Sequence, residues 1–169
     1  PMSGLARASA FLITRSDEAP NTYAIEFALR RLNPKARVFR ARTVPDKWID
    51  AAGGEHEPSH VSEQAALAFC GLGNPNAFWR TLARIGIKPL ACIAYDDHHQ
   101  YSPSEVRRLA QHARDLGSRM LLTTAKDAVN LPPDYAAILG DLQLYRLEIR
   151  TEIEEEAELV KLMQGAALR

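Results

Sequence analysis

The chain has few cysteines and no net charge, and both features exclude classes of protein. Its 169 residues include two cysteines, Cys70 and Cys92, with no CxxC spacing around them. We therefore expect neither a disulfide framework nor a cysteine metal site, and both cysteines are interpreted as small residues of buried strands. Lysine plus arginine balance aspartate plus glutamate at 21 each. The balanced charge therefore gives no reason to expect a nucleic-acid partner.

Long apolar runs are also absent. No stretch approaches the roughly 18 consecutive apolar residues of a membrane-spanning helix, and the N-terminus has no signal-peptide pattern. A hydrophobic content of 46% with 25% charged residues is typical of a soluble globular protein. The length of 169 residues fits one domain. We therefore expect a single domain over residues 1–169.

What the sequence does contain is an alternation of short apolar runs with helical patterns. The apolar runs predict strands at residues 8–14, 37–43, 65–70, 90–94, 119–123 and 142–149. The helical patterns begin at about residues 21, 74, 102, 125 and 151. This order predicts an α/β fold, a three-layer αβα sandwich with a mostly parallel, Rossmann-like sheet. Segment 45–62 has Gly53-Gly54 and Pro58 and little periodicity, so we expect a loop or linker there.

The densest cluster of reactive side chains lies at residues 94–101, after an apolar run and before a helix start. Open α/β sheets bind ligands at such a strand end. Asp97, His98 and His99 could hold a metal ion, although neighbours on an extended chain point apart and at most two would converge. Alternatively, one histidine relays a proton or orients a carboxylate. A solvated loop in which Asp97 caps the turn is the third interpretation.

Two further motifs follow predicted strands. Gly71 and Gly73 lie in a turn before Asn74, which suits the start of a helix, so backbone N–H groups there could approach an anion. The dinucleotide-binding fingerprint is incomplete, because Asn76 stands at the third glycine position, and a plain tight turn explains the pattern equally well.

The other motif is Thr124-Ala125-Lys126-Asp127. Thr124 and Asp127 have the spacing of a helix-capping pair, for which a structural role is sufficient. Lys126 places a cation in the first turn of the expected helix, where it opposes the helix dipole. We therefore expect Lys126 to face a phosphate or an acidic partner.

These motifs together resemble the C-terminal half of the tetraacyldisaccharide 4'-kinase family, the lipid A 4'-kinases. The matching residues are Phe-Cys-Gly-Leu-Gly-Asn-Pro at 69–75 with Phe78, Thr81 and Leu82, then Asp97-His98-His99 with Tyr101, then Thr-Thr-Ala-Lys-Asp-Ala-Val at 123–129. The opening residues 1–8 resemble the start of the family's second half, and the match continues to about Leu131. Ala125 and Asn130 depart from the family pattern, which usually has Glu and often Lys there.

The resemblance implies part of an ATP-dependent kinase that phosphorylates the 4'-hydroxyl of the tetraacyldisaccharide 1-phosphate lipid A precursor. This reaction takes place at the cytoplasmic face of the inner membrane of Gram-negative bacteria. The family's P-loop lies in its N-terminal half, and nothing here matches G-x-x-x-x-G-K-[ST]. ATP and Mg²⁺ are therefore expected in the full-length enzyme and not on this domain alone, which we expect to be inactive by itself.

The resemblance also implies the partners, namely the N-terminal P-loop domain and the lipid A disaccharide precursor. Peripheral membrane contact would come mainly from the P-loop half, and the chain itself would be soluble. His98 would be catalytic as the partner of an aspartate outside this chain, with Asp97 beside it, whereas His99 is regarded as variable. The candidates for facing substrate or phosphate are Gly71, Gly73, Asn74, Thr124, Lys126 and Asp127, and no metal site is expected.

Two other functions remain open. One is a stand-alone α/β metal-dependent hydrolase or ligand-binding module that uses Asp97, His98 and His99. The other is a structural domain that only completes a substrate cleft.

Overall fold

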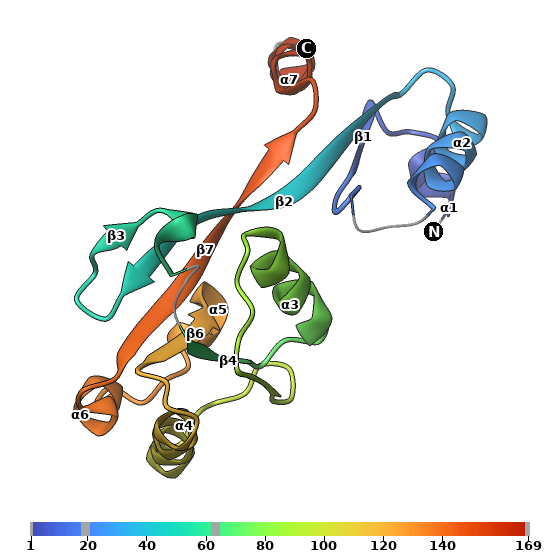
Figure 1. Ribbon diagram of the computed structural model, residues 1–169. Helices are drawn as coiled ribbons and strands as arrows, with labels where there is room; N and C mark the ends of the chain where they lie inside the picture. The colour runs from blue at the N-terminus through green and yellow to red at the C-terminus, as the bar shows by residue number, and fades with distance from the viewer. Residues whose placement is uncertain (1, 18–20, 62–64, 168–169) are drawn as a thin grey trace. The chain divides into compact units, whose positions relative to one another are not determined.

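The computed structural model describes residues 2–17, 21–61 and 65–167, and the chain forms two compact units. Unit 1 comprises residues 1–44 and 150–169, and unit 2 comprises residues 45–149. Two long strands, β2 (Arg37–Asp50) and β7 (Gln143–Ile153), each contribute to both units (Figure 1). The length of the chain predicted one domain, and apolar periodicity does not reveal two units, because it indicates which residues are buried but not which core they join.

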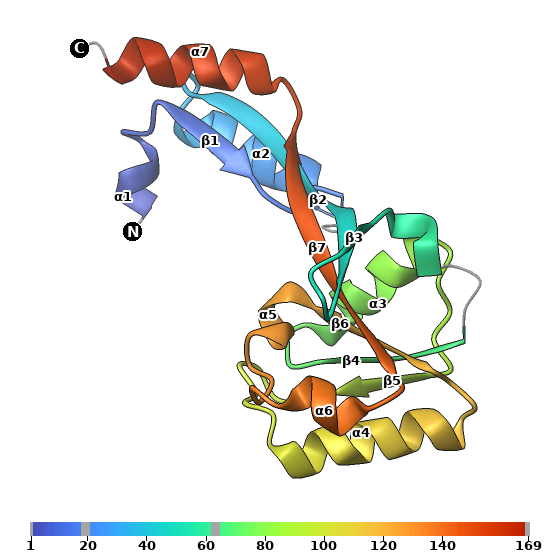
Figure 2. The ribbon, with the colours of Figure 1, turned by 90° about the vertical axis from the view of Figure 1, so that its left-hand side faces the viewer.

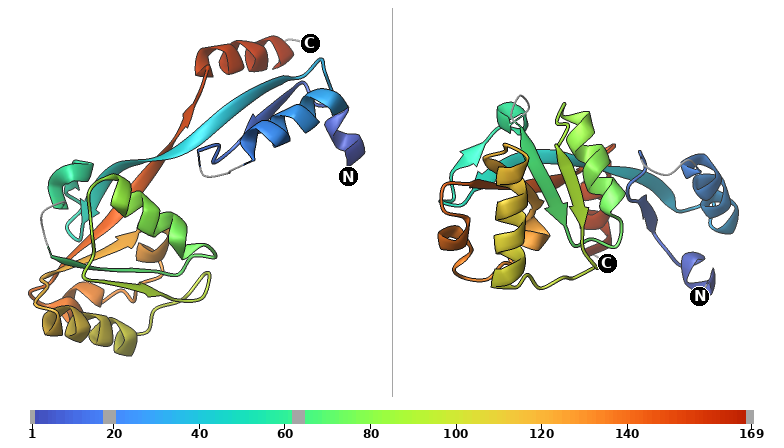
Figure 3. Two further views of the ribbon diagram at one scale, coloured as in Figure 1. Left: turned by 45° about the vertical axis from the view of Figure 1, so that its right-hand side comes forward. Right: turned by 60° about the horizontal axis from the view of Figure 1, so that its bottom comes forward.

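Unit 1 contains α1 (Met2–Leu5), β1 (Ala10–Ile13), α2 (Thr22–Leu32) and α7 (Glu156–Ala167), together with parts of the two long strands. Strand β1 pairs with β2 in parallel, and α2 packs beside β1 (left view of Figure 3). Leu12 of β1 is 42% exposed, so this apolar strand is not buried on both faces. Helix α7 begins at Glu156 and not near Thr151, because β7 continues to Ile153.

Unit 2 carries the motifs singled out in the sequence. Its elements besides the two long strands are β3 (Glu55–His56), the 3₁₀ helix η1 (Pro58–Val61), β4 (Ala66–Cys70), α3 (Pro75–Arg84), β5 (Ala91–Ala94), α4 (Pro103–Asp115), β6 (Met120–Thr124), α5 (Ala125–Ala128) and α6 (Tyr135–Leu139). The neighbouring strands β7, β6, β4 and β5 are parallel in that order, and β3 pairs antiparallel with β2.

Helices cover both faces of the sheet in unit 2. Helix α3 lies on one face and helices α4 and α6 on the other (Figure 2). Phe78 and Leu82 of α3 join a core that includes Trp48 and Met120. On the opposite face a second core forms around Leu67 and Phe69 of β4, Val106 and Leu109 of α4, and Leu139 of α6. The expected three-layer α/β architecture with a mostly parallel sheet is confirmed.

The expectation of a loop at 45–62 is wrong for most of that segment. Strand β2 continues to Asp50, and β3 and η1 follow it, while residue 62 lies outside the described residues. Trp48 is completely buried, and its Nε1 donates a 3.0 Å hydrogen bond to the Pro58 carbonyl. The sequence conceals this strand because Pro45, Asp46 and Lys47 interrupt the apolar pattern, whereas Gly53 only forms the turn of the hairpin, with φ of 89°.

The two cysteines are both free but differ in exposure. Cys70 is buried in β4, and burial raises the pKa of its thiol to about 12. Cys92 is exposed, contrary to the expectation of a buried strand, because β5 stands at the end of the strand order and buries little of its surface.

Candidate functional site

Three motifs meet at the carboxyl edge of the sheet in unit 2. Strand β4 lies between β5 and β6, and all three run in the same direction (right view of Figure 3). The segments that follow them, residues 71–74, 95–101 and 124–127, therefore lie at one edge of the sheet. The chain leaves β4 for α3 on one face and leaves β6 towards α6 on the other. This is a topological switch point, the place where open α/β sheets bind ligands.

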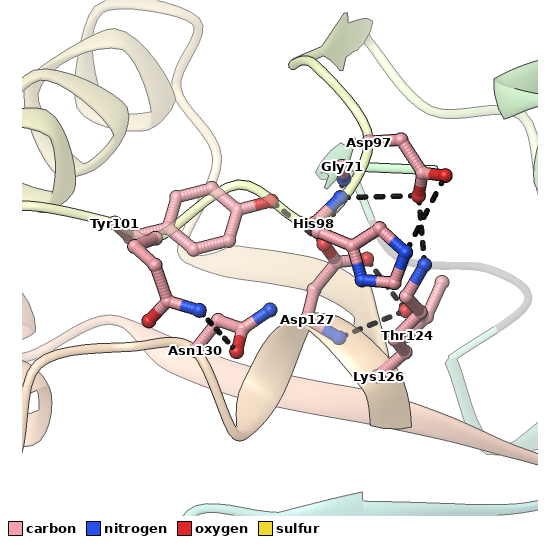
Figure 4. A network of polar contacts seen from close by, with 9 residues as sticks. Gly71, Asp97, His98, Tyr101, Thr124, Lys126, Asp127 and Asn130 are labelled. Atoms are coloured by element: carbon pink, nitrogen blue, oxygen red, sulfur yellow. Dashed lines mark hydrogen bonds and ion pairs between the residues drawn. The ribbon is translucent and has the colours of Figure 1, made fainter. Parts of the chain in front are cut away.

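Asp97 and Lys126 form an ion pair across this edge. The Lys126 Nζ lies 2.7 Å from the Asp97 Oδ1, and both side chains are about half exposed (Figure 4). The hydrogen bond from Lys126 is the main reason why the pKa of Asp97 is lowered, and the nearby His98 adds to the effect. Helix α5 has only four residues, so Lys126 lies in its last turn as well as its first, and the expected opposition to a helix dipole is weak; the partner of the ammonium is Asp97.

His98 is the most exposed of the reactive side chains, with 76% of its side chain accessible. Its Nε2 lies 3.7 Å from the Asp97 Oδ2, so the same carboxylate lies between the imidazole and the Lys126 ammonium. The His98 backbone adopts φ of 60°, which is uncommon for a residue other than glycine. Its backbone N–H donates hydrogen bonds to the Gly71 carbonyl at 3.3 Å and to the Asp97 Oδ1 at 3.0 Å.

His99 has different partners. Its Nε2 lies 3.1 Å from the Glu105 Oε1 in the capping box of α4, and its ring stacks on Tyr95 with centroids 4.6 Å apart. Within residues 2–17, 21–61 and 65–167, no group of three or more His, Cys, Asp or Glu side chains is placed to hold a metal ion. The geometry therefore does not favour the alternative in which Asp97, His98 and His99 share a metal.

Asp127 is buried and does not face solvent, in contrast to its expected position among the phosphate-facing candidates. Its Oδ1 accepts hydrogen bonds from the Gly71 N–H at 2.7 Å and the Tyr101 hydroxyl at 2.9 Å. Its Oδ2 accepts from the Thr124 hydroxyl at 2.5 Å. The Thr124 Oγ1 in turn accepts from the Asp127 N–H at 3.1 Å, so Thr124 is the side-chain N-cap of α5. Both side chains therefore make their hydrogen bonds within the protein.

The glycine turn presents two exposed residues. Gly71 is buried, whereas Gly73 and Asn74 are exposed. Asn74 is the N-cap residue of α3, but its side chain makes no capping hydrogen bond. A Cβ at Gly73 would lie 3.2 Å from the Asp97 Oδ2, so this turn lies directly against the ion pair. Asn74 and Lys126 are thus accessible residues of two neighbouring strand ends.

Tyr101 and Asn130 were not predicted from the sequence as site residues. Tyr101 is 4% exposed, and burial together with the adjacent Asp127 raises the pKa of its hydroxyl. The Tyr101 N–H donates to the Asn130 carbonyl at 3.0 Å. Tyr101 was already part of the matching motif, but its partner lies 26 positions away, and a local pattern does not reveal such a contact.

Across the described parts of the chain, none of the helices is long and apolar enough to cross a membrane.

Comparisons with known proteins support one family. The family described as tetraacyldisaccharide-1-P 4'-kinase matches residues 1–167. A tetraacyldisaccharide 4'-kinase of Halothermothrix orenii is 30% identical over 96% of this chain and 46% of its own length. The protein of the same name from Rhodopseudomonas palustris is 32% identical over 92% of this chain and 41% of its own length.

A solved structure has the same fold. The LpxK protein of Aquifex aeolicus, crystallised in complex with ATP, superposes with a TM-score of 0.64 over 98% of this chain and 44% of its own. The two sequences are 21% identical, so this likeness concerns the fold. The chain spans less than half the length of these relatives.

Proposed function

Because the chain belongs to the tetraacyldisaccharide-1-P 4'-kinase family, we propose that it is the C-terminal part of an ATP-dependent kinase. The kinase phosphorylates the 4'-hydroxyl of a tetraacyldisaccharide 1-phosphate, the lipid A precursor. The observation that carries the proposal is the family match over residues 1–167. The cluster of Asp97, His98 and Lys126 at the carboxyl edge of the sheet supports it.

In this reaction the 4'-oxygen forms a bond to the γ-phosphorus, and the bond from that phosphorus to the β–γ bridging oxygen breaks to release ADP. The hydroxyl proton must pass to a base. We assign His98 as the partner of an aspartate outside this chain, where the imidazole orients the carboxylate or shares the proton. Its exposure leaves the imidazole accessible to a carboxylate from another domain.

Lys126 is our candidate for contact with a phosphate oxygen. Its ammonium is half exposed and already bound to a carboxylate oxygen of Asp97, so an anion of similar geometry can replace that partner. Gly73 and Asn74 lie beside the ion pair and are exposed, so they are the further candidates. Asp97 is assigned the role of holding Lys126 in place before the anion binds, and of lying beside His98.

The residues of this chain suit a phosphate group better than a complete nucleotide site. Lys126 can bind one anion, whereas the described residues include no group of three metal-ligating side chains. We therefore assign ATP and Mg²⁺ to the P-loop domain that would form the rest of the enzyme. The magnesium ion, when bound, neutralises charge on the transferring phosphoryl group.

We further propose that the complete enzyme works at the cytoplasmic face of the inner membrane of a Gram-negative bacterium. The acyl chains of the proposed substrate favour a membrane surface, since each buried methylene contributes about 0.8 kcal/mol.

An activity assay on two preparations tests the proposal. The full-length protein that contains this chain is incubated with ATP, Mg²⁺ and the tetraacyldisaccharide 1-phosphate, and 4'-phosphorylated product is expected. The 169-residue chain alone is expected to give none. Failure of the full-length protein to phosphorylate the lipid would contradict the kinase assignment. Metal-dependent release of phosphate by the 169-residue chain alone would instead support the alternative of a stand-alone metal-dependent hydrolase.

A further inference from the structure

Asp127 is the only charged side chain among the buried residues that the structure describes. Burial of a carboxylate is costly unless it is well hydrogen-bonded. Three donors from three different segments satisfy it, namely the Gly71 N–H, the Tyr101 hydroxyl and the Thr124 hydroxyl (Figure 4). The carboxylate thus joins the ends of β4 and β6 to the loop after β5.

Two of these donors lead directly to His98. Gly71 donates its N–H to Asp127 and accepts the His98 N–H on its carbonyl at 3.3 Å. Tyr101 lies three residues after His98, and its hydroxyl binds the same Asp127 oxygen at 2.9 Å. Asp127 therefore fixes both the group that receives the His98 amide and the far end of the loop that carries His98.

The packing around Gly71 leaves no room for a side chain. A Cβ at Gly71 would lie 2.9 Å from the Asp96 carbonyl oxygen and 2.9 Å from the His99 Cβ. Gly71 therefore packs closely against the residues on both sides of His98. The left-handed conformation of His98, with φ of 60°, persists only where its surroundings hold it in place.

We propose that Asp127 and Tyr101 are positioning residues for His98, and that their hydrogen bond keeps the imidazole in the orientation that phosphoryl transfer requires. This inference rests on the proposed function of His98. Neither side chain would touch the substrate, because both are buried. A purely structural role would lower stability without acting on turnover through His98.

The test uses Tyr101→Phe in the full-length protein, because this change removes one hydroxyl and leaves the ring and the other bonds of Asp127 intact. A small misplacement of a catalytic group lowers turnover strongly, so we expect kcat to fall by about tenfold, with KM for ATP within about twofold. The matched control is Tyr95→Phe, in the same loop. Among the described residues the Tyr95 hydroxyl has no hydrogen bond that the structure records, so turnover should not change.

A double-mutant cycle separates positioning from general stability. In a His98→Ala background, Tyr101→Phe should lower kcat no further, because its effect passes through His98. Wild-type kcat in the Tyr101→Phe variant overturns the inference. An equal loss of kcat with and without His98 also overturns it.

A measurement that does not depend on turnover distinguishes failure of this inference from failure of the proposed function. The ¹³Cα chemical shift of His98 reports its backbone conformation, and we expect Tyr101→Phe to move it away from the left-handed value while Tyr95→Phe does not. If His98→Ala has wild-type turnover, the proposed function fails. The positioning inference then depends on this shift, and an unchanged shift in Tyr101→Phe overturns it.

Discussion

Asp97 lies between the Lys126 ammonium and the His98 imidazole, and this arrangement determines the chemistry of the exposed part of the site. Lys126 lies 2.7 Å from one oxygen, and the His98 Nε2 lies 3.7 Å from the other. Because these side chains are partly exposed, solvent screens the pairs and their effect on stability is small. Their effect on protonation is more informative, since the pKa of Asp97 is lowered mainly by Lys126.

We predict that Lys126→Met raises the pKa of Asp97 towards its ordinary value. The lowered pKa in the folded state means that Asp97 contributes stability above its unfolded pKa, and that this contribution is lost as the pH falls through the folded value. The variant should therefore lose stability less steeply on acidification. Carboxyl NMR titration and unfolding at several pH values measure both effects. Lys88→Met, at another exposed lysine of unit 2, should leave the pKa of Asp97 unchanged.

At the scale of the elements, the strand-end turns depend on close approach of backbone segments. A Cβ added at Gly71 would lie 2.9 Å from a backbone oxygen and from another Cβ, whereas a Cβ added at Gly73 would meet the Asp97 side chain, at 3.2 Å from its Oδ2. A flexible side chain can move aside, but a backbone segment in a packed turn cannot do so without strain.

We predict that Gly71→Ala lowers the free energy of unfolding by about 2 kcal/mol, within the range for overpacking a buried position. Gly73→Ala should cost less, because the Asp97 carboxylate can move. Urea denaturation of both variants measures the difference. Equal losses of unfolding free energy in the two variants would contradict the claim that close backbone packing at Gly71 makes its substitution more costly.

The start of α4 provides a second prediction for an element. The Ser102 hydroxyl accepts from the Glu105 N–H, and the Glu105 carboxylate accepts from the Ser102 N–H at 2.8 Å. We predict that Ser102→Ala costs about 1 kcal/mol in the free energy of unfolding, the usual value for a lost N-cap. Asp134→Ala is the control, because Asp134 occupies the N-cap position of α6 without a side-chain capping bond. A similar loss in both variants would contradict the capping assignment.

For the molecule as a whole, local patterns predicted the layers and the place of the site but not the long-range contacts. The helix start at about residue 102 and the strand at 65–70 have complete local signatures, and both were predicted. Trp48 was missed because charged neighbours interrupt its strand, and Tyr101 was missed because its partner Asp127 lies far along the chain. Contacts of this kind depend on strand order, which periodicity does not contain.

For Lys126, the sequence indicated the type of partner but not which residue it is. Its position in the first turn of a helix predicted a phosphate or an acidic partner, and the structure places Asp97 beside it. Whether a phosphate replaces Asp97 depends on the ligand, so that part of the expectation stays a prediction.

The most direct test of the central claim is the turnover of the His98→Ala variant of the full-length protein. We predict that kcat for phosphorylation of the tetraacyldisaccharide 1-phosphate falls by about 10²-fold or more, the usual contribution of a positioned proton-transfer group. Stability should change little, because the imidazole is exposed. His112→Ala, at an exposed histidine of α4, should keep wild-type turnover. Wild-type kcat in the His98→Ala variant would contradict the assignment of His98 to phosphoryl transfer.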